Sequence, residues 1–229
     1  MKKKNPFALH KLDWLEKLTC VLAIWFLIYP KPYDILMGVL LVIPIAGIII
    51  NGLQKPSIAS LVEVTKDKEG VNKYDVADFI DIAAWIILIR VLLDYEFESF
   101  YSLLLPGAVA FVLMLLILLL THRLIVQSTK NKWWIYISII FNVFLYSYAG
   151  TYAINCTYDY SKPEIYKNEV LDKHTSRRRR GGTTYYVTVK PWGNHYEKED
   201  ISVSMQEYQK LQIGDEVEIA VKKGVFNIP

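Results

Sequence analysis

Five long apolar runs within residues 1–155 constrain this chain more than any other feature. A helix that crosses a hydrocarbon layer of about 30 Å needs roughly 20 apolar residues, because each residue adds about 1.5 Å. Since 53% of the residues are hydrophobic, the chain is also too apolar for an ordinary soluble protein. We therefore predict an α-helical integral membrane protein with about five transmembrane helices, at residues 12–29, 33–53, 77–95, 103–121 and 133–153.

The first run is the shortest. Its uninterrupted apolar part, residues 18–29, spans the layer only if residues 12–17 are included, with Glu16 and Lys17 reaching the interface. Two alternatives stay open: a cleavable signal peptide, for which Tyr29-Pro30-Lys31-Pro32 is a poor cleavage site, and a re-entrant hairpin of the first two runs. The hairpin would leave the sidedness of everything after it unchanged.

Basic residues predict the orientation. Twelve of them flank the runs on one side of the expected membrane, whereas the opposite side has Lys31 and, after the third run, the acidic stretch 94–98. Basic loops stay in the cytoplasm, so we expect a cytoplasmic N-terminus and an extracytoplasmic C-terminal part in an inner or plasma membrane. The twelve are Lys2, Lys3, Lys4, Lys11, Lys17, Lys55, Lys66, Lys68, Lys73, Arg123, Lys130 and Lys132.

Few polar residues lie inside the runs. Arg90 and Asp94 are four residues apart, which places them on one face of a helix as an ion pair. Alternatively, Arg90 faces a cavity and binds an anionic headgroup or small solute. Asp78 and Asp81 fit the positive end of a helix dipole, and we expect Asn142 to donate a hydrogen bond to a neighbouring helix.

A change of composition follows the fifth run. Residues 156–163 form a linker, and residues 164–229 show the alternating pattern of a small all-β domain, either barrel-like or an open sheet. We expect strands over 164–173 and 185–190, at Ile201 and Val203, and over 216–222. A short helix over 205–211 should precede the last strand.

Four adjacent arginines, Arg177, Arg178, Arg179 and Arg180, precede two glycines in the connection between the first two of these strands. Such a run is either a solvated hairpin tip or a contact for an anion, such as a lipid headgroup, an acidic polysaccharide or an acidic protein. The formal net charge of only +3 and the external location predict no nucleic-acid partner.

The chemistry-bearing residues form no recognised catalytic motif. His174 and His195 raise a metal site without supplying a third ligand type, and Cys20 and Cys156 lie at different membrane levels and cannot bridge. We therefore predict no catalytic residues, no metal and no cofactor.

The pattern Tyr208-x-x-Leu211-x-x-Gly214-Asp215-x-Val217-x-Ile219, followed by Gly224-Val225-Phe226-Asn227-Ile228-Pro229, resembles the terminal β module of uncharacterised multi-span bacterial membrane proteins. The resemblance covers about a third of the chain and implies no reaction. We expect a non-enzymatic membrane protein that presents this module to a protein partner or a second copy, as an accessory or immunity-type protein does. The alternative is a lipid- or solute-handling protein with a headgroup site at Arg90 and Asp94.

Overall fold

The computed structural model describes residues 12–66, 72–95, 101–125, 132–177, 182–193 and 195–228. They divide into two compact units. The helical unit comprises the described residues up to Asp159 together with Gly224–Ile228, and the β unit comprises Tyr160–Lys223. The β unit is therefore inserted between two parts of the helical unit, whereas the sequence led us to assign residues 164–229 to one module.

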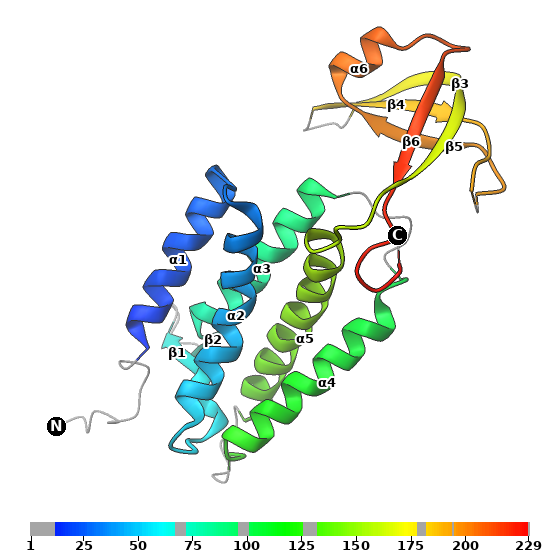
Figure 1. Ribbon diagram of the computed structural model, residues 1–229. Helices are drawn as coiled ribbons and strands as arrows, with labels where there is room; N and C mark the ends of the chain where they lie inside the picture. The colour runs from blue at the N-terminus through cyan, green and yellow to red at the C-terminus, as the bar shows by residue number, and fades with distance from the viewer. Residues whose placement is uncertain are drawn as a thin grey trace. The chain divides into compact units, whose positions relative to one another are not determined.

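Five helices build the helical unit, and helices that follow one another in the chain run in opposite directions (Figure 1). They are α1 (Asp13–Ile28), α2 (Tyr33–Gly52), α3 (Asp78–Asp94), α4 (Leu104–Thr121) and α5 (Lys132–Thr157). Helix α3 packs against α1, α2 and α5. Its side chains Phe79, Ile80, Ala83 and Ile87 are fully buried, which makes α3 the centre of the apolar core.

Small residues let these helices approach closely. A Cβ atom on Gly47 of α2 would lie 2.4 Å from the ring of Phe79, and one on Gly107 of α4 would lie 2.6 Å from the ring of Tyr148. Pro44 lies inside α2 without ending it. Pro44 lacks the amide that would donate to the Leu40 carbonyl. The carbonyl of the next residue, Leu41, accepts a hydrogen bond from the Tyr146 hydroxyl of α5.

Three of the described helices, α2, α4 and α5, are long and apolar enough to cross a membrane. The other two predicted spans, α1 and α3, have 16 and 17 residues. Both are bounded by charged residues: α1 starts at Asp13 and α3 runs from Asp78 to Asp94. At about 1.5 Å per residue they reach roughly 24–26 Å, somewhat short of an average hydrocarbon layer.

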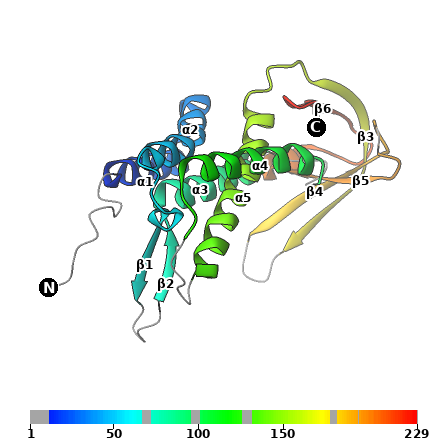
Figure 2. The ribbon, with the colours of Figure 1, turned by 90° about the horizontal axis from the view of Figure 1, so that it is seen from below.

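The connection from α2 to α3 contains structure that the sequence did not lead us to expect. A short 3-10 helix, η1 (Ile58–Leu61), leads into an antiparallel hairpin of β1 (Val62–Lys66) and β2 (Asn72–Val76). Figure 2 shows this hairpin extending from the helices. The Ser57 hydroxyl begins η1 by accepting a hydrogen bond from the Ala59 amide.

The β unit is a four-stranded antiparallel sheet in the order β5-β4-β3-β6, which confirms the four predicted strands. The strands are β3 (Glu164–Arg177), β4 (Thr183–Val189), β5 (Glu199–Val203) and β6 (Glu216–Val221), with the helix α6 (Met205–Lys210) before β6. Strand β3 is longer than predicted because it serves two partners. Residues up to Glu169 pair with β6, and those from Val170 on pair with β4, with a register shift between Val170 and Asp172.

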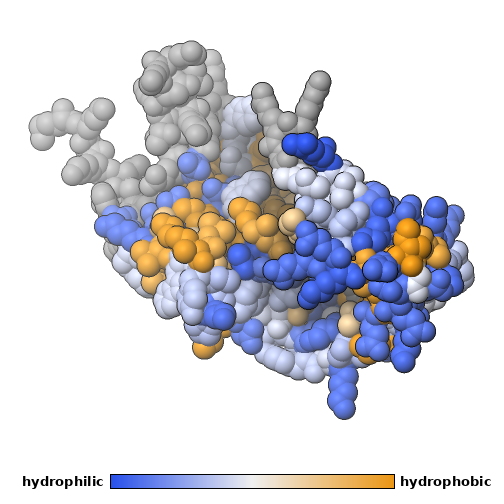
Figure 3. Space-filling view, turned by 90° about the horizontal axis from the view of Figure 1, so that it is seen from above, coloured by the Kyte–Doolittle hydropathy of each residue, from blue (hydrophilic) through white to orange (hydrophobic). Residues whose placement is uncertain are grey.

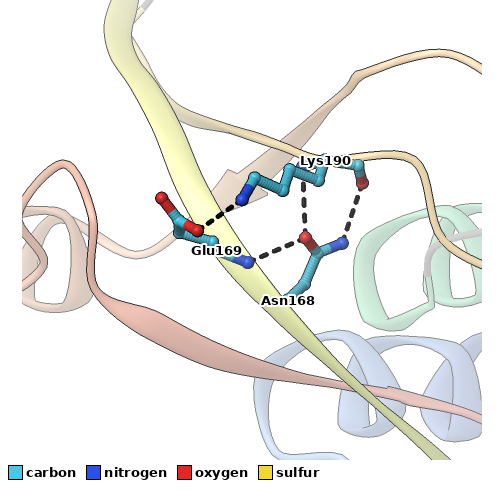
Figure 4. Close-up of polar contacts among 3 residues, drawn as sticks. All are labelled: Asn168, Glu169 and Lys190. Carbon is cyan, nitrogen blue, oxygen red and sulfur yellow. Dashed lines mark hydrogen bonds and ion pairs between the residues drawn. The ribbon is translucent and has the colours of Figure 1, made fainter.

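A buried asparagine holds the sheet where β3 changes partner (Figure 4). The Asn168 side chain donates to the Lys190 carbonyl at 2.8 Å, and its oxygen accepts from the amides of Lys190 and Glu169 at 3.1 and 2.8 Å. The Lys190 ammonium also pairs with Glu169 at 2.5 Å. Asn168 thus satisfies backbone groups that the interrupted strand ladder would leave unpaired.

Candidate functional site

Arg90 and Asp94 form the ion pair that their spacing predicts. The Arg90 Nη2 atom lies 2.6 Å from both carboxylate oxygens of Asp94. The two side chains are 11% and 25% exposed, so the pair is largely enclosed at the end of α3. A carboxylate at this distance offsets part of the cost of burying a guanidinium group.

Aromatic residues of two other helices surround the guanidinium group. Its central carbon lies 5.5 Å from the ring centroid of Phe26, at the end of α1, and 6.0 Å from that of Tyr33, at the start of α2. The Tyr33 ring packs edge-on against Tyr95, whose hydroxyl is 3.4 Å from the Thr157 hydroxyl at the end of α5. Arg90 therefore joins the ends of α1, α2 and α3.

This Arg90 cluster contains a buried donor without an acceptor among the described residues, the Arg90 Nε–H. The Tyr33 hydroxyl, also buried, lies close to Asp94 and Tyr95. Buried donors are normally satisfied by protein or by water, so one oxygen atom from water or from a ligand would complete the cluster. Chemically, the cluster can hold an oxygen acceptor beside an already neutralised cation, and it offers no nucleophile.

Of the arginine run, the structure describes the first residue, at the end of β3. Arg177 is exposed, ends β3 and pairs with Thr183 of β4. Arg178, Arg179 and Arg180 lie outside the described residues. Arg177 and the Arg90–Asp94 pair belong to different units, so they are two separate candidates.

Nothing in the sequence pattern indicated a polar network at the end of α2 and α4. The Asn51 side-chain oxygen lies 2.8 Å from the Ser60 hydroxyl and 3.0 Å from His122 Nε2. His122 Nδ1 lies 2.8 Å from the Thr121 hydroxyl. A proton on Nε2 fits the contact with the Asn51 oxygen, whereas the Thr121 hydroxyl proton is shared between His122 Nδ1 and the Ile117 carbonyl, which lies 2.6 Å away. Burial lowers the pKa of His122.

Lys173 is a second residue that the pattern did not single out. Its ammonium group donates to the carbonyl of Tyr208 at 2.5 Å and to that of Leu211, at the end of α6, and lies 4.4 Å from the Tyr208 ring centroid. A cation there satisfies carbonyls that a helix end leaves free. Lys173, on β3, thus links the end of α6 to the sheet by hydrogen bonds.

Two smaller expectations have clear outcomes. The prediction that Asn142 donates to a neighbouring helix was wrong, because its side-chain nitrogen donates to Ser138 of the same helix at 3.0 Å. Both cysteines are free, as predicted. Asn142 bonds within its own helix because the carbonyl one turn earlier is always within reach.

The two histidines of the β unit have separate partners. His174 stacks on Tyr186 with centroids 5.2 Å apart and lies 3.7 Å from Asp200. His195 stacks on Trp192 and lies 3.3 Å from Glu199. In the described part of the chain, no three histidine, cysteine or acidic side chains gather as metal ligands would.

Comparison with known proteins adds no relative. No protein-family model matches the chain, and no match was found among curated proteins or among solved structures.

Proposed function

We propose that this chain is a multi-pass protein of an inner or plasma membrane, whose helices anchor an extracytoplasmic β unit that binds a partner without catalysing a reaction. The observation that carries the membrane assignment is the surface of α4. Helix α4 has no charged residue, and only 17% of its most apolar stretch is buried. Leu105 and Leu120, near its two ends, are 75% and 73% exposed.

Soluble monomers rarely expose a continuous apolar surface of this length. The exposed large side chains of α4 extend over its whole length: Leu104, Leu105, Val109, Val112, Leu113, Leu116, Leu119 and Leu120. A lipid environment explains them, because lipid tails are as apolar as leucine. By contrast, the face shown in Figure 3 is mostly hydrophilic, with smaller hydrophobic groups.

The alternating helix directions support five spans rather than three. Helices α1 and α3 lie alongside α2 and α5 in one bundle, so a membrane around the longer helices would also contain the shorter ones. Much of α3 packs against α1, α2 and α5, so less of its surface than that of α4 is expected to face lipid. The excess of basic residues at one end of this bundle then supports a cytoplasmic N-terminus.

Cysteine labelling tests the sidedness. Two single-cysteine variants are made in a Cys20→Ala, Cys156→Ala background. One carries Ser176→Cys, at an exposed position of β3, and the other carries Gln54→Cys, at an exposed position just after α2. A membrane-impermeant maleimide should label the Ser176→Cys variant in intact cells. It should label the Gln54→Cys variant only after the cells have been permeabilised. The reverse pattern would place the β unit in the cytoplasm and overturn the proposal.

The partner that fits the hairpin tip is anionic: an acidic protein surface, an acidic polysaccharide or a lipid headgroup. Four arginines in sequence attract carboxylates and phosphates and bind them in pairs of hydrogen bonds. Substitution of Arg177, Arg178, Arg179 and Arg180 by glutamine should abolish partner capture after crosslinking in cells. The control Lys198→Gln, Lys210→Gln removes positive charge elsewhere on the β unit and should not. Equal capture by both variants would exclude the tip as the binding site.

A second candidate function is favoured by the unsatisfied donor of the Arg90 cluster. A phosphate or carboxylate oxygen of a lipid or small solute would accept from Arg90 Nε. The variant Arg90→Leu, Asp94→Asn removes the site without leaving an unpaired carboxylate. Mass spectrometry of protein purified from phosphatidylglycerol vesicles should then show loss of the bound anionic lipid. Equal lipid content in both proteins would exclude this candidate.

A further inference from the structure

The segment Gly224–Ile228 returns to the helical unit and is held there by one side chain. Asn155, near the end of α5, donates from its side-chain nitrogen to the Ile228 carbonyl at 2.8 Å, and its side-chain oxygen accepts from the Phe226 amide at 2.9 Å. Its backbone carbonyl accepts from the Val225 amide at 3.0 Å. Asn155 is 3% exposed, so these bonds are made away from solvent.

The first residue of the segment meets equally specific requirements. The Gly224 amide donates to the buried Asp159 carboxylate at 2.9 Å. Gly224 has a φ of +70°, in the region that favours glycine, and a Cβ there would lie 2.3 Å from the Asn155 side chain. The site therefore selects glycine by conformation and by space.

The last residue of the segment supplies apolar contact. Ile228 packs against the apolar core of the helical unit. The site thus recognises three features of a five-residue peptide. They are a glycine at the first position, backbone hydrogen-bonding groups in the middle and an aliphatic side chain at the fifth position. Short-peptide sites in other proteins combine the same elements, with main-chain hydrogen bonds for affinity and a pocket for specificity.

We propose that the end of α5 is a peptide-binding site, occupied within the molecule by Gly224–Ile228, and that a free peptide of the same pattern exchanges with it. The bound segment acts as a strap. The chain enters the β unit after Asp159 and leaves it before Gly224, so the hydrogen bond between these two residues holds both connections of the β unit together. The inference does not depend on which side of the membrane the β unit faces.

Hydrogen exchange of the full chain in detergent micelles tests the occupied site. The Val225 and Phe226 amides should exchange slowly, and Asn155→Leu should speed the Phe226 amide at least about tenfold, because it loses its acceptor. Asn142→Leu, the same change deeper in α5, should leave both amides protected. Exchange at the unprotected rate in the unmodified protein would overturn the proposal.

Peptide exchange tests the site without relying on the Asn155 variant to fold. In the full chain, Gly224→Ala should displace the strap, because the added methyl group meets the Asn155 side chain. A labelled synthetic peptide, Gly-Val-Phe-Asn-Ile, should then bind this variant and raise its fluorescence anisotropy, whereas Ala-Val-Phe-Asn-Ile should bind at least about tenfold more weakly. No binding of the glycine peptide, or equal binding of both, would refute the site.

Discussion

The helical unit and the β unit are held together by different means. A large cluster of buried leucine, isoleucine, phenylalanine and alanine side chains joins all five helices. Among the described residues of the β unit, the fully buried apolar ones are Val170, Val187 and Val189, with partly buried neighbours such as Tyr208 and Ile219 around them. A core of this size gives a small domain little stability.

Specific polar contacts compensate for the small core of the β unit. Lys173 fastens α6, Asn168 joins two strands, and the Ser204 and Glu207 side chains cap the start of α6 reciprocally. In the helical unit, close helix contacts at glycines have a comparable stabilising role. Changes in volume should therefore damage the helical unit most, whereas loss of single hydrogen-bonding groups should damage the β unit most.

The largest expected effect is at Gly47. Replacing Gly47 by alanine places a methyl group 2.4 Å from the ring of Phe79, which is fully buried, and 2.9 Å from Leu15. We expect a loss of about 2–3 kcal/mol in the free energy of unfolding, measured by loss of helical circular dichroism on titration with SDS. Gly182→Ala is the control, because nothing lies within 4 Å of its added carbon. Equal stability of the two variants would contradict close packing at Gly47.

The next effect distinguishes two lysines of the β unit. Lys173→Met removes both bonds to the end of α6 and should cost about 2 kcal/mol, because charged donors contribute more than neutral ones. Lys190→Met removes a more exposed pair with Glu169 and should cost less than about 1 kcal/mol. Thermal unfolding of both variants, monitored by tryptophan fluorescence, measures the difference. If Lys190→Met is the more damaging, α6 does not depend on Lys173.

The sequence could predict features that repeat with a regular period. Alternating residues revealed the four strands of the β unit, and the four-residue spacing revealed the Arg90–Asp94 pair. The partners of Arg90 could not be predicted, since Phe26 and Tyr33 reach it only through helix packing. Asn155 and Gly224 are far apart in the chain, and no local pattern links them. The β1–β2 hairpin was also missed, although its five-residue strands are no shorter than β5.

A smaller effect concerns pH and the helical unit. Burial lowers the pKa of His122 in the folded protein, so the unfolded chain binds the proton first as pH falls through about 6.5. We expect the folded state to become less stable as the pH falls from 7 to 5.5. His122→Gln keeps a donor for Asn51 and should remove this part of the pH dependence. Unfolding titrations at the two pH values measure it, and identical pH dependence of both proteins would show that His122 titrates normally.

The smallest effect is expected from an exposed ion pair of the β unit. The hydrogen bond from Lys223 lowers the pKa of Glu164, and the Tyr166 hydroxyl contributes less. Because the folded pKa is lowered, any stabilisation exists above the ordinary pKa of glutamate and is lost as pH falls through the lowered value. Solvent surrounds both groups, so Lys223→Met should leave thermal unfolding at pH 7 unchanged, yet raise the Glu164 pKa in a carboxyl NMR titration. An unchanged pKa would mean that Tyr166 alone lowers the pKa of Glu164. A clear loss of stability would show that exposed ion pairs, as well as partly buried contacts such as those of Lys173, stabilise the β unit.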